Sequence, residues 1–167
     1  SQPGTKITGI SFSNAAVWLV QASTGAGEIE ISHSAFFLSG THGSNTRAGV
    51  LLLGGGTVKN SLFFGLAGVG LSLWDRNYEI SDVMVSDNSG MESGKLYLRR
   101  FPSGRIVTVN RTVVIRNRST RDRNGIQIGR SNGTIELNNV ISAQNKTVAI
   151  GNGKQAGLNV ISGANTT

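Results

Sequence analysis

The chain repeats a short motif seven times, and this repetition restricts the fold more than any other feature of the sequence. Each copy has a β-branched or aliphatic residue, a turn position and further strand-forming residues; the copies are ITGISF (7–12), IEISHSAFF (29–37), VKNSLFF (58–64), ISDVMV (80–85), VNRTVVI (109–115), LNNVIS (137–142) and GLNVIS (157–162). The intervals are 24, 27, 22, 29, 28 and 20 residues between the turn positions Gly9, His33, Asn60, Asp82, Arg111, Asn139 and Asn159. A period of this length predicts a stacked solenoid of short strands.

A second apolar alternation lies between consecutive turn positions. Its copies are VWLV (17–20), VLLL (50–53), VGLSLW (69–74), KLYLRR (95–100), GIQIG (125–129) and VAIG (148–151). Amphipathic runs long enough for a helix do not survive the glycine and asparagine interruptions. We therefore predict an all-β chain in which residues 1–167 form one solenoid domain of about six to seven coils.

The two ends of a solenoid expose unpaired strand edges and need protection. Residues 14–22 (NAAVWLVQA) fit a short helix, so we expect an N-terminal cap within 1–22. The sequence stops soon after the last motif, which predicts an open C-terminal coil, either because the chain is a fragment or because this edge takes part in assembly.

Composition agrees with a fold rich in tight turns. Glycine occurs 23 times and proline twice, and the lack of cysteine excludes a disulfide framework. No segment approaches the length of about 20 apolar residues that a membrane span requires.

A column of asparagines follows the turn positions by six residues, at Asn88, Asn117, Asn145 and Asn165. Side-chain amides stacked in this way can hydrogen-bond along the solenoid axis. Asparagines also open five N-x-Ser/Thr sequences, at Asn110, Asn117, Asn132, Asn145 and Asn165. Glycosylation is one interpretation, but turns and strands of this architecture use the same residues, and we favour the structural one.

The motif and the alternation that follows it resemble the right-handed parallel β-helix of the pectate-lyase-like superfamily, which includes phage tailspike and adhesin-type solenoids. The resemblance runs from about residue 7 to the C-terminus and is clearest in VKNSLFF–GLAGVGLSL (58–73), VNRTVVIRN–NGIQIG (109–129) and LNNVISAQN–TVAIG (137–151). It implies a single-stranded right-handed parallel β-helix that is extracellular, on a cell surface or on a virion. It also implies a carbohydrate groove on the third strand of each coil and the loops before it.

Positive charge is concentrated in the middle of the chain. The formal net charge is +7, and residues 99–130 alone hold nine arginines and one acid, which gives +8. A local positive field favours an anionic polysaccharide or an acidic protein surface as partner. Nucleic acid is disfavoured, because few aromatic residues lie near the arginines and no known nucleic-acid fold is present.

The expected third-strand sheet places several of these residues on one face. Stacking aromatics and bidentate arginines suit an acidic glycan, and the predicted carbohydrate-binding residues are Trp74, Lys95, Tyr97, Arg99, Arg116, Arg118, Arg121, Arg123 and Gln127. The alternative is that Trp74 and Tyr97 cover a solvent edge while Arg121, Asp122 and Arg123 form a local ion cluster.

Catalytic residues are not identified by the sequence, and whether the protein is an enzyme stays open. Glycoside hydrolysis needs two carboxylates across a cleft, yet no two acids recur at matching positions on adjacent coils. A metal-independent lyase could use Lys95, Tyr97 or an arginine as its base. No cofactor or metal is expected, since His33 and His42 fit a turn and a loop better than a metal site.

Three functions therefore remain. The first is an extracellular or virion-associated module that binds an anionic polysaccharide or acidic partner through an arginine-rich face. The second is a polysaccharide lyase or glycoside hydrolase. The third is a structural subunit of a fibre or trimeric spike that forms trimers or stacks end to end.

Overall fold

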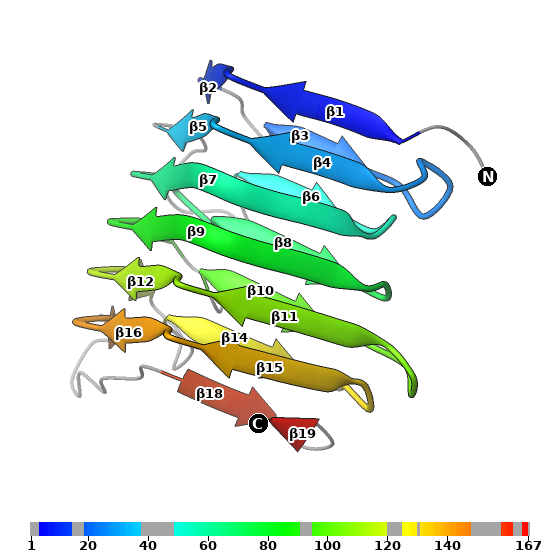
Figure 1. Ribbon diagram of the computed structural model, residues 1–167. Helices are drawn as coiled ribbons and strands as arrows, with labels where there is room; N and C mark the ends of the chain where they lie inside the picture. Colours follow the sequence, from blue (N-terminus) through cyan, green and yellow to red (C-terminus); the bar gives the residue numbers. More distant parts are fainter. Residues whose placement is uncertain are drawn as a thin grey trace.

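The computed structural model is a parallel β-solenoid, as the repeat predicts (Figure 1). It describes residues 4–14, 19–37, 49–90, 95–119, 125–129, 131–147, 158–161 and 165–166, the last two segments and residue 147 without their side chains. All strand pairs are parallel, and no helix occurs among the described residues. In this part of the chain, therefore, no helix is long and apolar enough to cross a membrane.

The first sheet contains eleven strands. Its long path is β1 (Thr5–Thr8), β4 (Ile29–Ser32), β7 (Gly56–Phe64), β9 (Tyr78–Ser86), β11 (Ile106–Asn110), β15 (Thr134–Asn138) and β19 (Asn165–Thr166). Short strands continue it beyond a bend, and they are β2 (Ser11–Ser13), β5 (Ala35–Phe37), β12 (Val113–Ile115) and β16 (Ile141–Ala143). In β7 and β9 the long and short parts form one continuous strand.

The second sheet lies behind the first and contains six strands. They are β3 (Val20–Ala22), β6 (Val50–Leu52), β8 (Leu71–Trp74), β10 (Leu96–Arg99), β14 (Ile126–Gly129) and β18 (Leu158–Ile161); a two-stranded sheet pairs β13 (Arg118–Ser119) with β17 (Lys146–Thr147). In Figure 1 the front strands run left, the rear strands run right and the chain descends from its N-terminus, so the solenoid is right-handed.

Left-handed residues form the corners of each coil. Six of the seven predicted turn positions have φ between 44° and 67°, namely Gly9, His33, Asn60, Asp82, Arg111 and Asn139. A second corner follows five residues later, with φ between 53° and 63°, at Asn14, Gly65, Asp87, Arg116 and Gln144. Glycine, asparagine and aspartate tolerate this conformation best, which explains the small polar residue of the motif.

The seventh turn position is wrong. Asn159 lies in β18, where it is the register partner of Gln127 in β14. The last motif therefore belongs to the second sheet, because its glycine and apolar alternation fit that strand as well as they fit a corner. As a consequence Asn165 is the partner of Thr134 rather than the next member of the asparagine column. The predicted third strand 148–151 lies outside the described residues.

Most of the described residues of the predicted N-terminal cap are in strands. Within 1–22, β1 pairs with β4, β2 with β5 and β3 with β6, so these three strands belong to the first coil. The centre of the predicted helix, residues 15–18, lies outside the described residues. Pairing with the next coil satisfies backbone groups that a short cap helix would leave exposed on the strand edge.

Four consecutive coils bury their inward side chains. Fully or almost fully buried positions of these coils include Ile31, Phe36, Leu52, Val58, Phe63, Leu71, Leu73, Ile80, Val85, Leu96, Leu98, Val107, Val109, Val114, Ile126 and Ile128. Phe12, Phe36 and Phe63 stack on one another with ring centroids 5.1 and 4.9 Å apart. Inward residues of the terminal coils, such as Ile7 and Leu137, are only partly buried. The fully packed part is thus about four turns, slightly shorter than predicted.

Asn88, Asn117 and Asn145 form the predicted ladder inside the solenoid. The Asn88 amide donates to Oδ1 of Asn117 at 3.0 Å, and the Asn117 amide donates to Oδ1 of Asn145 at 2.9 Å. Each Oδ1 also accepts the backbone N–H of the preceding asparagine in the column. Because Asn117 and Asn145 are buried, their amides are not accessible to glycosylation in the folded protein.

Asn117→Ala should destabilise the fold strongly, because it leaves several buried donors and acceptors of the ladder without partners. We expect a loss of about 2 to 4 kcal/mol in the free energy of unfolding, measured by urea titration. The matched control is Asn138→Ala, which removes an exposed Asn138–Asn110 contact of 3.1 Å and should cost less than about 0.5 kcal/mol. Equal losses in the two variants would contradict the ladder's structural role.

Candidate functional site

Residues from three strands meet on the outer face of the second sheet. The register places Ser72, Tyr97 and Gln127 in one row across β8, β10 and β14. A second row, two residues further along the strands, contains Trp74, Arg99 and Gly129. The sequence prediction that Tyr97, Arg99 and Gln127 lie on neighbouring strands of one sheet is therefore confirmed.

Trp74, Tyr97, Arg99 and Arg100 form a compact group that we call the aromatic–arginine cluster. The Arg99 guanidinium lies 4.9 Å from the centre of the Trp74 ring and 5.7 Å from that of Tyr97, and the Arg100 guanidinium lies 5.1 Å from Trp74. Cation–π attraction of this kind holds a guanidinium plane while leaving its N–H edge able to bind an anion. Neither arginine has an ion pair among the described residues.

Hydrogen bonds and packing hold the cluster in place. The Trp74 indole donates to Oγ of Ser72 at 2.8 Å. The buried Tyr78 hydroxyl lies 3.0 Å from the carbonyl of Trp74, and burial raises the pKa of Tyr78 to about 12. A Cβ atom at Gly129 would lie 3.4 Å from the Tyr97 ring. This is an ordinary van der Waals distance, so the Tyr97 ring packs directly beside the Gly129 backbone.

Lys95 differs from the prediction, which placed it on the exposed face. Its side chain is fully buried, and its ammonium donates to the carbonyl of Gly68 at 2.9 Å. Lys95 lies one residue before β10 begins, where strand alternation no longer determines the direction of a side chain. In this position it stabilises the packing between coils and is not presented to a ligand.

Gln127 lies beside Tyr97 as predicted, but it is fully buried. Neither its amide nitrogen nor its amide oxygen has a hydrogen-bond partner among the described residues. A buried amide without partners is costly, which makes Gln127 an unusual member of this face.

A second group of cations lines a hollow of about 650 Å³ at the second corner, which we call the corner groove. Its lining residues are Asp87, Ser89, Arg116, Arg118, Gln144 and Lys146. Arg118 and Lys146 are exposed register partners on β13 and β17. Like charges placed opposite each other on neighbouring strands repel, so this pair favours an anion in the groove.

Arg116 is held differently from the other predicted arginines. Its guanidinium forms two hydrogen bonds to the Asp87 carboxylate, at 2.9 and 2.7 Å. This pairing lowers the pKa of Asp87 and raises that of Arg116. Arg116 therefore lies at a corner in an ion pair, away from the aromatic–arginine cluster; Arg121 and Arg123 lie outside the described residues.

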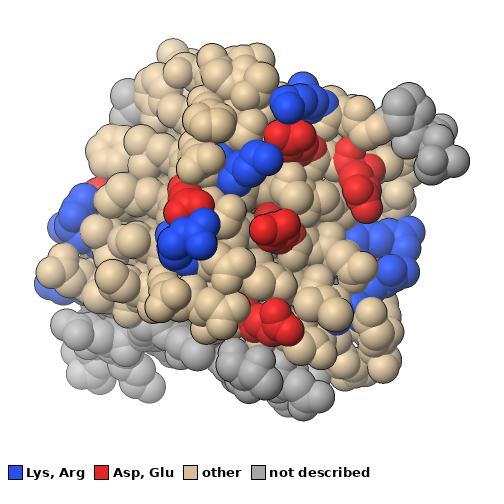
Figure 2. All heavy atoms as spheres, in the orientation of Figure 1, with Lys and Arg blue, Asp and Glu red and all other residues tan. Residues whose placement is uncertain are grey.

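Sequence reasoning missed Arg100 and Lys146 as members of these groups. It also missed that Asp82 pairs with Arg111, at 2.7 and 2.6 Å, in the way that Asp87 pairs with Arg116. A signal was present, because both aspartates precede their arginines by 29 residues, which is one coil. On the first-sheet side, Figure 2 shows several blue groups beside red ones, while other red groups stand apart.

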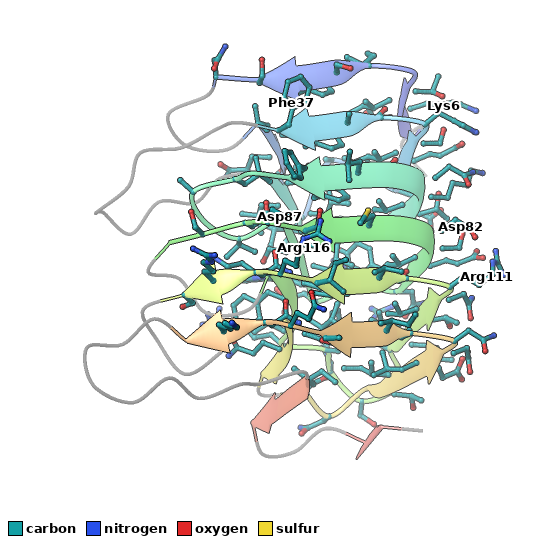
Figure 3. The ribbon with its side chains drawn as sticks, turned by 90° about the vertical axis from the view of Figure 1, so that its left-hand side faces the viewer. Lys6, Phe37, Asp82, Asp87, Arg111 and Arg116 are labelled. Carbon is teal, nitrogen blue, oxygen red and sulfur yellow. The ribbon has the colours of Figure 1, made fainter. Side chains whose placement is uncertain are left out.

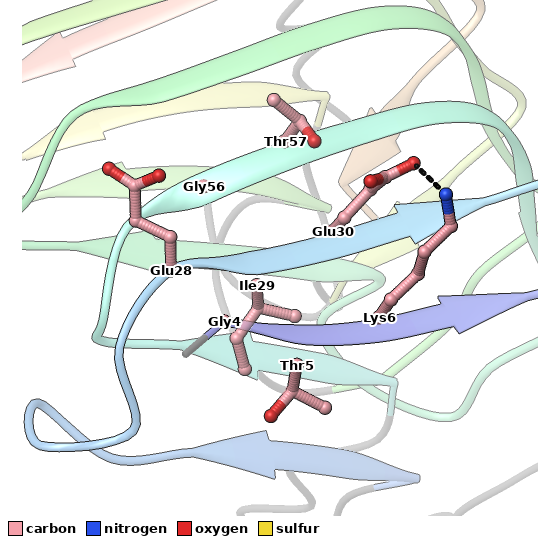
Figure 4. A pocket seen from close by; sticks show the side chains of 8 residues that line it. All are labelled: Gly4, Thr5, Lys6, Glu28, Ile29, Glu30, Gly56 and Thr57. Carbon is pink, nitrogen blue, oxygen red and sulfur yellow. Dashed lines mark ion pairs between the residues drawn. The ribbon is translucent and has the colours of Figure 1, made fainter. Parts of the chain in front are cut away.

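An ion-paired carboxylate, Glu30, also lines a hollow of about 350 Å³ near the N-terminal end of the first sheet (Figure 4). Lys6 and Lys59 both contact Glu30, at 3.3 and 3.4 Å, and the Lys6 contact is the larger cause of the lowered pKa of Glu30. Among the described residues no group of three or more His, Cys, Asp or Glu side chains could hold a metal ion. His33 occupies a left-handed corner, and His42 is not among these residues.

No family model, curated protein or solved structure matches this chain.

Acid should weaken the link between the coils at the second corner. Because the pKa of Asp87 is lowered in the folded state, its pairing stabilises the fold above the ordinary aspartate pKa and is lost as pH falls through the lowered value. We expect the melting temperature of Asp87→Asn to depend less on pH than that of the parent between about pH 5 and about pH 2. The control Glu79→Gln changes an exposed acid without an ion pair in the described structure, and it should retain the parent's pH dependence. A parent-like profile for Asp87→Asn would contradict the pairing.

Proposed function

We propose that the protein is a β-helix module, extracellular or attached to a virion, that binds an acidic polysaccharide at the aromatic–arginine cluster. The observation that carries this proposal is the stacking of Arg99 and Arg100 against Trp74, beside Tyr97, with no acid paired to either guanidinium in the described part of the chain. Aromatic rings and guanidinium groups are the two side-chain types that an acidic sugar needs.

The two arginines supply the specificity for negative charge. Arg100 is exposed and Arg99 is partly buried, so their N–H edges can form paired hydrogen bonds to a carboxylate or sulfate. Because both guanidinium groups already contact Trp74, this ring serves mainly to orient them. The Tyr97 ring, partly buried beside Gly129, is the better surface for a sugar.

The corner groove supports a long ligand rather than a single sugar. Arg118 and Lys146 lie on successive coils, and the spacing between neighbouring strands is about 4.8 Å. A polymer that carries repeated negative charges can contact both cations, whereas an uncharged glycan gains nothing from them. An acidic protein surface would use the same cations but would not explain the aromatic rings.

Binding is better supported than cleavage. Glycoside hydrolysis requires two carboxylates on opposite sides of the scissile bond. Of the residues that the structure describes, Asp75, next to Trp74, brings one carboxylate to this end of the second sheet. The parallel solenoid and the repeated sequence motif support a relationship to the pectate-lyase-like proteins and tailspike-type solenoids. This relationship in turn supports an extracellular, cell-surface or virion location.

Arg99→Ala/Arg100→Ala should weaken binding to a uronate polysaccharide at least tenfold, since each arginine contributes a charge-assisted hydrogen bond. Binding is measured by titration calorimetry at low and at moderate salt, and the parent should bind more weakly at the higher salt. The control Lys6→Ala/Lys59→Ala removes the same charge from the first sheet and should bind as the parent does.

Two outcomes would overturn this assignment. Equal loss of affinity in both double variants would mean that net charge, and not the cluster, determines binding. Shortening of the recovered polysaccharide by the parent protein would replace binding with a lyase or hydrolase activity.

A further inference from the structure

The outer face of the short strands is apolar over four neighbouring coils except at Ser86, which is 1 % exposed. One row of outward residues contains Leu62, Met84, Val113 and Ile141, and the next row contains Phe64, Ser86, Ile115 and Ala143. Ile141 is 57 % exposed and Phe64 is 40 % exposed. We call this surface the apolar ribbon. A continuous exposed apolar surface marks a contact site more often than isolated exposed residues do.

Two ion pairs border the apolar ribbon, one on each side (Figure 3). Asp82–Arg111 lies along the first corner and Asp87–Arg116 along the second. In both pairs the aspartate belongs to the coil of β9 and the arginine to the next coil, which contains β12. The charges therefore change sign at the same level on both borders, midway between β9 and β12.

The ribbon also has a hollow and a projection. A shallow hollow of about 680 Å³ follows its first-corner side, where Leu62, Met84 and Val113 are among the lining residues. Ile141 lies in the same row on the next strand but does not line the hollow. Leu62 and Ile141 are placed symmetrically, each one and a half coils from the level at which the charges change sign.

We propose that the apolar ribbon binds a second copy of this chain in antiparallel orientation, with a two-fold axis between β9 and β12. This axis places Asp82 of one copy opposite Arg111 of the other, and Asp87 opposite Arg116, so four alternating charges meet on each border. It also inserts each exposed Ile141 into the other copy's hollow beside Leu62. The charge pattern and the shape of the ribbon are thus self-complementary about the same axis. A two-fold interface requires this, because the same surface of both copies forms it.

The size of the ribbon predicts a weak dimer. From strand spacing and rise, four strands and their two corners cover about 19 by 17 Å, or about 300 Å² for each copy. A stable interface buries about 800 Å² on each partner. We therefore expect association with a dissociation constant between about 10 μM and about 1 mM.

Sedimentation equilibrium over this concentration range should show a monomer–dimer equilibrium for the parent chain. Ile141→Glu should weaken it at least tenfold, because a carboxylate would replace the apolar contact between Ile141 and Leu62 of the other copy. The control is Ile106→Glu, since Ile106 is 48 % exposed on the first sheet and outside the ribbon, and this variant should dimerise like the parent. A parent that stays monomeric, or equal behaviour of the two variants, overturns the proposal.

Disulfide cross-linking tests the orientation, and the chain has no cysteine to interfere. Leu62→Cys/Ile141→Cys should form covalent dimers on mild oxidation. These two positions cannot bridge within one chain, because three coils separate them by about 14 Å. Leu62→Cys/Ile106→Cys serves as the control. Equal dimer yields from the two double variants would contradict the antiparallel arrangement.

Discussion

The in-register backbone pairing between coils is the constraint on which the rest of this structure depends. Each strand hydrogen-bonds to the equivalent strand of the next coil, and the corners continue the pattern: the N–H of Gly9 donates to Ser32, that of His33 to Lys59 and that of Arg111 to Asn138. Since unpaired buried backbone groups are costly, one pairing fixes the next. Residues at equivalent positions therefore form columns along the axis, whatever the loop lengths between them.

The residues in these columns are always one coil apart, but their chemistry differs from column to column. Inside the solenoid, asparagines one coil apart share their amides. At the corners, an aspartate above an arginine forms a closed ion pair. Between β13 and β17, two cations lie opposite each other, and this position favours an anion from outside. Columns in which the charges are balanced therefore serve the structure, whereas columns with unbalanced charges can bind a ligand.

Much of the fold could be predicted because the corners have a strong chemical signature. Left-handed φ values favour residues such as Gly9, Asn60 and Asp82, and these recur among the strand-forming residues. Asn159 was misassigned because its flanking pattern fits a corner and a strand of the second sheet equally well. The alternation of apolar residues predicts which side chains share a face of a strand, but it does not predict which strand is the neighbour. For Asn159 the neighbour is β14.

The candidate site was predictable only where strand alternation controls direction. Tyr97 and Arg99 lie within β10, and they point outward together with Trp74 of β8. Lys95 lies just before the strand begins, and its buried side chain donates to the carbonyl of Gly68. Arg116 could have been assigned from its one-coil distance to Asp87, but a cluster of arginines in sequence does not reveal which of them are already paired.

Register between coils can be measured directly with paired cysteines on the first sheet. Thr57 and Glu79 are register partners on β7 and β9, with outward side chains, whereas Ser81 lies two residues further along β9. Thr57→Cys/Glu79→Cys should form an intramolecular disulfide on oxidation. Thr57→Cys/Ser81→Cys should not, because its Cα atoms are about 8 Å apart. Similar yields from the two variants, or the reverse order, would contradict the in-register stacking.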